Sequence, residues 1–317
     1  MTAFNLQAEL EKIGANHAPW LGFGTAHLGV GGERENAAQL LNEAFEQGIR
    51  YFDTARLYGD GESEFAIGET FASKRQQIIL TSKAGIIPWT ERKALRLQNK
   101  VRRLIGLQPL PVEHVFGAFN LAQLKASFDK SLRALRTDYL DILLLHECAV
   151  EQTQNDDILA WAEALKQAGK IRAFGSAATL AETDRILTAR PRGLDVVQHA
   201  HDALTPLPEI PIDMPCQRIT HSALSHVLPA VNARLAQGDD LATRFETEFG
   251  IDLRKPAQWI PKLLQHNHDV TGGAPVLFST TRPGRIAATL KGLERASATD
   301  AELLKTLQSE LVSIAPE

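Results

Sequence analysis

The sequence predicts a closed (β/α)8 barrel, an α/β fold of TIM-barrel type, in a single domain spanning residues 1–317. Short runs with strand-forming residues alternate with longer stretches of helical period, which is the pattern of a parallel sheet with crossover helices. A chain of 317 residues is long enough for one such barrel with insertions. Its composition, 44% hydrophobic and 23% charged, is that of a globular enzyme that buries a full core.

Eight segments are expected to form the barrel strands. They are residues 21–26, 49–54, 78–83, 139–146, 171–176, 195–200, 216–222 and 275–280. Between them, apolar residues recur with helical spacing in residues 37–47, 121–135 and 158–168. Gly169, followed by Lys170, is typical of the C-terminal end of a helix. Strands and helices therefore alternate along the chain as a barrel requires.

Two connections are expected to depart from a regular barrel. Four prolines fall between the sixth and seventh strands: Pro206, Pro208, Pro211 and Pro215. Because proline in a helix interior costs about 3 kcal/mol, we expect that sixth crossover to be irregular. The loop after the third strand, residues 85–119, is unusually long and contains a basic helical piece at 92–104. Loops after strands form the active-site face of a barrel, so this one is a candidate lid over the substrate. A polar segment, 235–270, is expected to be helical in part.

Charge and composition exclude several classes of partner. The net charge of −4 provides no basic field for a nucleic acid, so none is expected as a partner. The N-terminal residues lack a basic stretch before an apolar core, and no run of 18 apolar residues occurs, so neither secretion nor membrane insertion is expected. The two cysteines, Cys148 and Cys216, form no disulfide framework and are interpreted as buried thiols of a cytoplasmic protein.

Four polar residues are expected to converge on the active-site face. Asp53 ends the second strand, and Tyr58 follows five positions later in the sequence FDTARLYG. The segment IILTSKAG places Lys83 at the end of the third strand, and YLDILLLHE places His146 at the end of the fourth. The C-terminal ends of barrel strands are where catalytic residues are found. Each residue alone has a structural interpretation, but the four together predict a catalytic site.

The chemistry of this set is self-consistent. A tyrosine has a pKa near 10, and the ammonium group of Lys83 is expected to lower the pKa of Tyr58. Asp53 is the partner that keeps Lys83 charged when buried. His146 can donate a hydrogen bond to a substrate oxygen and assist proton transfer. The arrangement suits delivery of a hydride to a carbonyl carbon and of a proton to its oxygen.

In these segments the chain resembles the aldo-keto reductase family, of the long-loop bacterial, aldose-dehydrogenase-like type. The resemblance is carried by LGFGTAHLG, FDTARLYGDGESE, TSKAG, LLLHE and GKIRAFG, and is dense from about residue 20 to 200. It implies that Asp53, Tyr58, Lys83 and His146 are catalytic, with Tyr58 as the general acid. It also implies a nicotinamide cofactor and a small carbonyl or sugar substrate, which is reduced or, in the reverse direction, oxidised as an aldose or alcohol.

The resemblance also implies cofactor-binding residues in the second half of the chain. Gln198, in DVVQHAH, matches a glutamine that contacts the nicotinamide amide. His221, in ITHSAL, stands where the family usually has a tyrosine that stacks on the nicotinamide ring. In STTRPGRIAAT, Ser279 stands for the family's lysine, Thr280 for its serine and Arg285 for its arginine.

These matches favour NADP, with NAD as the second candidate. Arg285 can pair with a 2′-phosphate in a bidentate way, with Arg282 as a second candidate, and backbone amides near residues 281–284 can bind phosphate. Ala177 and Ala178 replace the family's Ser-Asn pair. Together with Thr289 in place of an asparagine and with the serine at 279, these departures predict weak cofactor binding.

Two other functions stay open on the sequence. A cofactor-binding barrel that acts as a non-catalytic sensor or regulatory subunit is favoured by the weakened cofactor positions, whereas the complete catalytic set argues against it. A metal-dependent hydrolase would need a His-X-His pair at the first strand, where only His27 occurs. His199 and His201 form such a pair without a further ligand, so no metal is expected. The sequence leaves the substrate, the reaction direction and the oligomeric state open.

Overall fold

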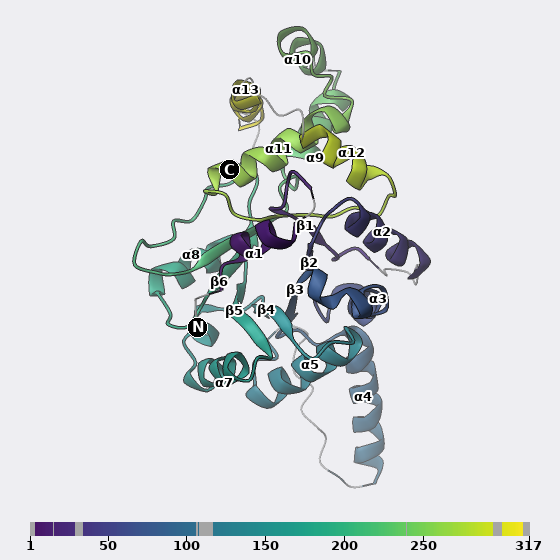
Figure 1. The fold of residues 1–317 in the computed structure, drawn as a ribbon, viewed down its shortest axis with the longest axis vertical. Helices are drawn as coiled ribbons and strands as arrows, with labels where there is room; N and C mark the ends of the chain where they lie inside the picture. Colours follow the sequence, from purple (N-terminus) through teal and green to yellow (C-terminus); the bar gives the residue numbers. More distant parts are fainter. Residues whose placement is uncertain are drawn as a thin grey trace.

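The computed structural model describes residues 4–14, 16–28, 34–105, 107, 117–238, 240–293 and 300–312. Within them, eight parallel strands close into a barrel in chain order, from β1 next to β2 round to β8 next to β1 (Figure 1). The strands are β1 (Leu21–Gly24), β2 (Tyr51–Asp53), β3 (Ile79–Ala84), β4 (Leu140–His146), β5 (Ile171–Ala177), β6 (Val196–Ala200), β7 (Gln217–His221) and β8 (Val276–Phe278). All eight predicted strands are confirmed, with ends that differ by no more than two residues.

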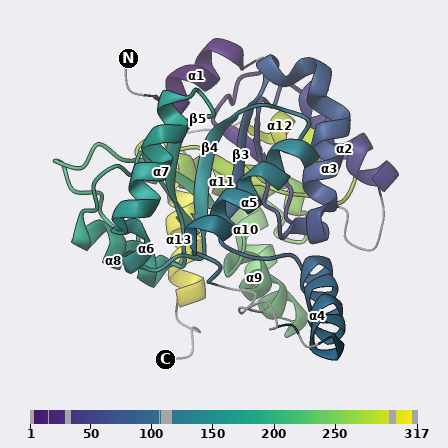
Figure 2. The same cartoon turned by 90° about the horizontal axis from the view of Figure 1, so that it is seen from below.

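Helices surround the barrel, as the view turned by 90° also shows (Figure 2). Those of the first half are α1 (Leu6–Ile13), α2 (Arg34–Glu46), α3 (Glu62–Phe71), α4 (Trp89–Leu104), α5 (Leu121–Ala134), α6 (Val150–Thr153) and α7 (Asp156–Gln167), with 3-10 turns η2 (Tyr58–Gly61) and η3 (Ala72–Gln77). The second half contributes α8 (Leu180–Ala189), α9 (Val227–Ala236), α10 (Leu241–Phe249), α11 (Pro256–Val270), α12 (Arg285–Leu293) and α13 (Asp300–Val312). The predicted helices at 37–47, 121–135 and 158–168 correspond to α2, α5 and α7.

Local sequence explains where these helices begin and end. The side chain of Asn120 accepts a hydrogen bond from the amide of Ala122 at the start of α5, and Asn155 accepts one from Ile158 in α7. Such N-terminal caps satisfy amides that have no partner inside the helix. At the end of α7, Gly169 adopts a φ of 67°, the left-handed conformation expected of a terminating glycine.

Alternation along the strands decides which residues face the barrel interior. The buried interior cluster contains residues of a single parity from each of the strands β2 to β8: Tyr51, Ile79, Ile142, Leu144, Ala173, Ala177, Val196, Ile219 and Leu277. Continuing the same parity towards the C-terminal ends of the strands brings in Asp53, Lys83, His146, Gln198 and His221. Three of the four residues predicted to be catalytic, together with two predicted to bind the cofactor, therefore form the last inward-facing layer of the barrel, and Tyr58 follows in the turn η2.

Close packing in the interior depends on a glycine. A Cβ atom on Gly22 would lie 2.4 Å from the ring of Tyr51 on the neighbouring strand. Since β1 and β2 pair with Gly22 opposite Tyr51, any side chain at this position would displace the tyrosine ring. The missing side chain makes room for Tyr51 in the layer beneath Asp53.

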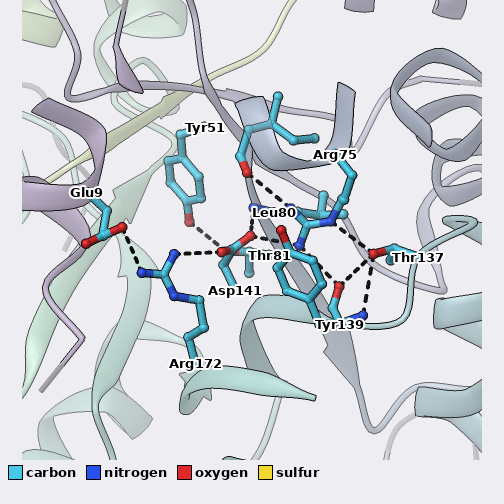
Figure 3. A network of polar contacts seen from close by, with 10 residues as sticks. Glu9, Tyr51, Arg75, Leu80, Thr81, Thr137, Tyr139, Asp141 and Arg172 are labelled. Atoms are coloured by element: carbon cyan, nitrogen blue, oxygen red, sulfur yellow. Dashed lines mark hydrogen bonds and ion pairs between the residues drawn. The ribbon is translucent and has the colours of Figure 1, made fainter. Parts of the chain in front are cut away.

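A buried ionic network closes the opposite end of the barrel (Figure 3). Asp141 on β4 is 1% exposed and accepts hydrogen bonds from Arg75 (2.8 Å), Arg172 (3.0 Å) and the amide of Leu80 (2.9 Å). Arg172 also pairs with Glu9 on α1 at 2.7 Å. Because a buried carboxylate is costly unless paired, these donors are what permit Asp141 at this position. The network fixes α1 across the bottom of the barrel, away from the layer of Asp53 and Lys83.

The two predicted irregular connections are also present. No helix forms in residues 201–216, the proline-rich sixth crossover. After β3, α4 extends away from the body of the barrel (Figure 1), and residues 106 and 108–116 of this loop lie outside the described residues. The polar segment 235–270 forms α10 and α11, which pack with α9 and α13 around Trp259. In the part of the chain that the structure describes, no helix has both the length and the apolarity to cross a bilayer.

Candidate active site

Lys83 is the centre of a buried hydrogen-bond cluster at the C-terminal ends of β2 and β3. Its ammonium group contacts a carboxylate oxygen of Asp53, donates to the carbonyl oxygen of Thr54 at 3.0 Å and lies 3.2 Å from the hydroxyl of Tyr58. Asp53 and Lys83 are each 2% exposed. Asp53 pairs with Thr81, two positions before Lys83, so both side chains point inward from neighbouring strands. The three residues thus form one continuous chain of polar contacts.

The second oxygen of Asp53 is bound from a distant strand. Gln198 on β6 donates from its amide nitrogen to this oxygen at 2.7 Å. The resemblance implied contact with a nicotinamide amide, and the structure adds a contact with the carboxylate of Asp53. Gln198 also lines a cavity next to Tyr58, so its side chain remains within reach of a bound cofactor.

His146 lies against Tyr58. The two ring centroids are 5.7 Å apart and the planes are nearly perpendicular, at 88°. His146 is 7% exposed at the end of β4, which pairs with β3. The structure therefore brings together all four residues predicted to be catalytic.

The protonation of Tyr58 differs from the expectation. Burial raises the pKa of Tyr58 above its usual value, and the attraction of Lys83, which lowers it, does not outweigh burial together with the carboxylate of Asp53. The expectation of a lowered pKa was wrong because it counted the neighbouring ammonium and not the burial of the phenol. For Lys83, burial acts to lower the pKa, but Asp53 and Tyr58 together raise it. At neutral pH the site therefore holds a protonated phenol beside an ammonium group.

Two histidines at the site are neutral at physiological pH. Burial, with a smaller contribution from Lys83, lowers the pKa of His146 to about 3 and that of His221 to about 4. A neutral imidazole carries one N–H donor and one acceptor nitrogen. His146 can therefore hydrogen-bond a carbonyl oxygen beside Tyr58 without adding a second positive charge.

A cavity of about 360 Å³ opens beside this cluster. Asp53, Tyr58, Gln198, His221 and Ser279 all line it, and so does the exposed His27. His221 is held by a 2.7 Å contact between its Nδ1 atom and the hydroxyl of Ser222. A pocket with apolar walls and a few converging polar groups suits a planar ring such as nicotinamide. Gln198 and His221 would hold that ring.

The remaining predicted cofactor residues do not line this cavity. The hydroxyl of Thr280 accepts from the amide of Arg282 at 3.1 Å, so it closes a local turn. Arg285, the first residue of α12, is exposed, and neither it nor Arg282 has an ion-pair partner among the described residues. Thr289 is 7% exposed on the inner side of α12. Of the two cations predicted as phosphate ligands, Arg282 and Arg285, both are therefore exposed and can reach a phosphate from solvent.

An acidic residue occupies the turn where a phosphate was expected. Both carboxylate oxygens of Glu43 on α2 lie 3.0 Å from the amide nitrogen of Gly284. This amide was predicted to be available to a cofactor phosphate, and in the structure it already binds an anionic group. This amide can bind an anion, but the carboxylate of Glu43 already occupies it. No local sequence signal could identify this contact, which joins residues 241 positions apart.

A second unpredicted cluster joins the loop after β2, which carries Arg56 and Tyr58, to α4. Arg56, which lies between Asp53 and Tyr58 in the sequence, contacts the buried Glu64 at 3.4 Å and also pairs with Glu91 in the first turn of α4. Lys130 on α5 holds the other oxygen of Glu91 at 2.6 Å.

These contacts fix the start of the long loop beside a second cavity, of about 350 Å³, that Ile86 and Glu91 line. Trp89 is 49% exposed and lines neither cavity. Among the described residues of the loop 85–119, none lines the cavity at Tyr58.

The His-X-His pair faces away from the site. His199 has the opposite parity to Gln198 and is fully buried, with its Nδ1 atom 2.9 Å from the carbonyl oxygen of Ala200. Among the described residues, no group of three His, Cys, Asp or Glu side chains is arranged to hold a metal ion.

Comparison with known proteins identifies the family. The model of the aldo/keto reductase family matches residues 20–217. The uncharacterized oxidoreductase YqkF of Bacillus subtilis is 32% identical over 164 residues, which cover 52% of this chain and 47% of that protein. An NADH-specific methylglyoxal reductase of Escherichia coli is 32% identical over 58% of this chain and 55% of its own length. The chain thus matches about half the length of these relatives.

Among solved structures, an aldo/keto reductase from Klebsiella pneumoniae in complex with NADP and acetate superimposes with a TM-score of 0.62. Its sequence is 20% identical, and the match covers 92% of this chain and 91% of that one. At this identity the likeness concerns the fold alone. The family match extends over most of the barrel, from β1 through β6, and includes the strands that carry Asp53, Lys83 and His146. The chain belongs to the aldo/keto reductase family.

Proposed function

We propose that this protein is an oxidoreductase that reduces an aldehyde or ketone with a nicotinamide cofactor, NADP or alternatively NAD, or oxidises an aldose or alcohol in the reverse direction. The observation that carries the proposal is the chain of contacts from Asp53 through Lys83 to the hydroxyl of Tyr58, beside a cavity. In it a phenol hydroxyl and a buried ammonium group lie together at one point on the barrel face, which supports a role for the phenol as proton donor. We also propose that residues 1–317 form one domain, since β8 closes the same barrel as β1.

In this proposal Tyr58 is the general acid. When bound, the cofactor supplies the hydride to the carbonyl carbon. Tyr58 gives its phenol proton to the carbonyl oxygen, so that the π bond of the carbonyl is replaced by new C–H and O–H bonds and the C–O single bond remains. The raised pKa of Tyr58, caused by burial, keeps the phenol protonated at neutral pH. General acids of this kind typically contribute about 10²- to 10⁴-fold to the rate.

Lys83 and Asp53 act on the phenolate that this transfer leaves. The ammonium group of Lys83, 3.2 Å from the hydroxyl, is already in position to stabilise a negative oxygen. Asp53 keeps that ammonium charged in a fully buried position, where burial alone would lower its pKa. His146, neutral and next to the tyrosine ring, is placed to orient the carbonyl oxygen. In the reverse direction the same groups accept the proton from an alcohol.

The activities for which relatives are named support a small substrate. One relative is named as a methylglyoxal reductase and another as a D-threo-aldose 1-dehydrogenase, which is 33% identical over half of this chain. Both names describe chemistry at a carbonyl or hemiacetal carbon of a small molecule. We therefore propose a small carbonyl or sugar as the substrate. Both cysteines are free thiols, which suits a cytoplasmic location.

The test is a fluorescence titration of the purified protein with NADPH and NADH, followed by a panel of aldehydes and aldoses with each nucleotide that binds. Nucleotide-dependent turnover of any member supports the proposal. Binding without turnover over the whole panel would favour a non-catalytic sensor instead. That second candidate is favoured by Ala177 and Ala178, which carry no polar side chain toward a carboxamide. Absence of binding would contradict both.

A further inference from the structure

Helix α2 places a carboxylate at the N-terminus of α12. Glu43 accepts from the amide of Gly284 with both oxygens at 3.0 Å, and Asn36 on the same helix donates to the carbonyl oxygen of Thr281 at 3.3 Å. Gly284 precedes α12 with a φ of 78°. Amides at the start of a helix point outward and attract anions, because they lack partners within the helix. Glu43 meets this requirement from within the chain.

The cations next to this amide have no such internal partner. Arg282 and Arg285 flank Gly284, both are exposed, and neither forms an ion pair in the part of the chain that the structure describes. One short turn therefore combines two guanidinium groups directed to solvent with one carboxylate bound to the backbone. The guanidinium groups favour a phosphate, whereas the carboxylate disfavours one.

We propose that Glu43 is a specificity-determining residue that discriminates against the 2′-phosphate of NADPH and so narrows the preference for NADPH over NADH. The proposal rests on the function proposed above, because it assumes that the adenosine end of the cofactor reaches the turn at residues 282–285. A phosphate there competes with Glu43 for the amide of Gly284 and is repelled by its charge. NADH carries a hydroxyl in place of this phosphate, and a hydroxyl can donate a hydrogen bond to a carboxylate.

The experiment measures dissociation constants of both nucleotides by fluorescence titration of the purified protein, for wild type, Glu43→Gln and Glu46→Gln. Glutamine at position 43 keeps an oxygen that can accept from Gly284 and removes only the charge. Glu46 is exposed one turn further along α2, so its replacement removes the same charge without touching the turn. We expect Glu43→Gln to tighten NADPH binding by roughly tenfold, and NADH binding to change by less than about threefold. Glu46→Gln should leave the ratio of the two constants unchanged.

Three results would overturn the proposal. An unchanged ratio in Glu43→Gln shows that the charge does not discriminate. Equal weakening of both nucleotides, with a lower urea midpoint of unfolding, shows that Glu43 only fixes α2 to α12. The same change of ratio in Glu46→Gln shows a long-range charge effect. If wild type binds neither nucleotide, the proposed function itself fails, and this outcome is distinct from binding of both with an unaltered ratio.

Discussion

Gln198 and Asp53, 145 positions apart in the chain, are joined by a buried hydrogen bond of 2.7 Å across the barrel interior. Asp53 therefore has a separate partner for each oxygen: Lys83 from the adjacent strand and Gln198 from β6. A buried carboxylate needs such donors, because it has lost its contacts with water. Gln198 thus holds the carboxylate of Asp53 in addition to making the cofactor contact expected of it.

The first prediction concerns this bond. Gln198→Ala should lower the free energy of unfolding by about 1 to 3 kcal/mol, because one oxygen of the buried Asp53 loses its donor. Urea denaturation at neutral pH measures the change. Gln198→Glu should be worse still, since it places two carboxylates together. Unaltered stability in Gln198→Ala would mean that the amide serves only the cofactor.

Loss of the phenol should abolish turnover and leave nucleotide binding nearly intact. Tyr58→Phe removes the proposed proton donor, and we expect the rate to fall by about 10²- to 10⁴-fold. Tyr51→Phe is the matched control. That hydroxyl lies in the layer below and, among the described residues, hydrogen-bonds Thr81 alone, at 3.1 Å, so its loss should leave the rate within about fivefold. A Tyr58→Phe variant with the wild-type rate would require another acid.

The sequence predicted the barrel and the convergence of Asp53, Lys83 and His146 because both depend on alternation along strands. Once Asp53, Lys83 and His146 are each placed at a strand end, the parallel sheet brings them together without further information. What it missed were contacts between distant side chains, such as Glu43 with Gly284 and Arg56 with Glu91. The direction of the Tyr58 pKa was also wrong, because it depends on the depth of burial as well as on the neighbouring charge.

Acid should destabilise the protein already below pH 6.5. Burial lowers the pKa of His146 to about 3 and of His199 and His221 to about 4, whereas an unfolded histidine titrates near 6.5. From pH 6.5 downward the unfolded chain binds protons that the folded chain does not, so stability is complete above pH 6.5 and is lost as the pH falls. Each such histidine contributes up to about 1.4 kcal/mol per pH unit.

Urea denaturation at pH 7.5, 6.5, 6.0 and 5.5 measures this slope, and His199→Gln tests its origin. Of the three titrating histidines, His199 does not line the cavity beside Tyr58, so this variant removes one titrating side chain without altering that cavity. The slope of the unfolding free energy against pH, between pH 6.5 and 5.5, should fall by the contribution of about one bound proton, whatever the change in absolute stability. An equal slope in the variant would assign the pH dependence to other groups.

Arg56 should matter more for stability than its partner Glu91. Arg56→Leu leaves the fully buried Glu64 with hydroxyl donors such as Ser82 but no cation, and we expect a cost of about 3 kcal/mol or more. Glu91→Gln breaks a pair whose acidic side chain is 30% exposed, so its cost should stay below about 1 kcal/mol. Urea denaturation compares the two variants. Similar costs would show that Arg56 contributes to stability through its ion pair with Glu91 on α4 rather than through Glu64.

The last prediction concerns the cation that receives the 2′-phosphate. Arg285 is exposed at the first position of α12 and has no ion-pair partner among the described residues, so its guanidinium group is available to a phosphate. A charge-assisted hydrogen bond is worth about 1.5 to 3 kcal/mol, which corresponds to roughly tenfold to a hundredfold in affinity. Arg285→Ala should weaken NADPH binding by this factor and change NADH binding little, because only NADPH carries the phosphate.

Arg282→Ala, three residues earlier in the same turn, is the control for loss of one positive charge. Fluorescence titration with both nucleotides measures the effect. If Arg282→Ala abolishes the preference and Arg285→Ala does not, the phosphate is bound by Arg282. If neither does, the preference does not arise at this turn.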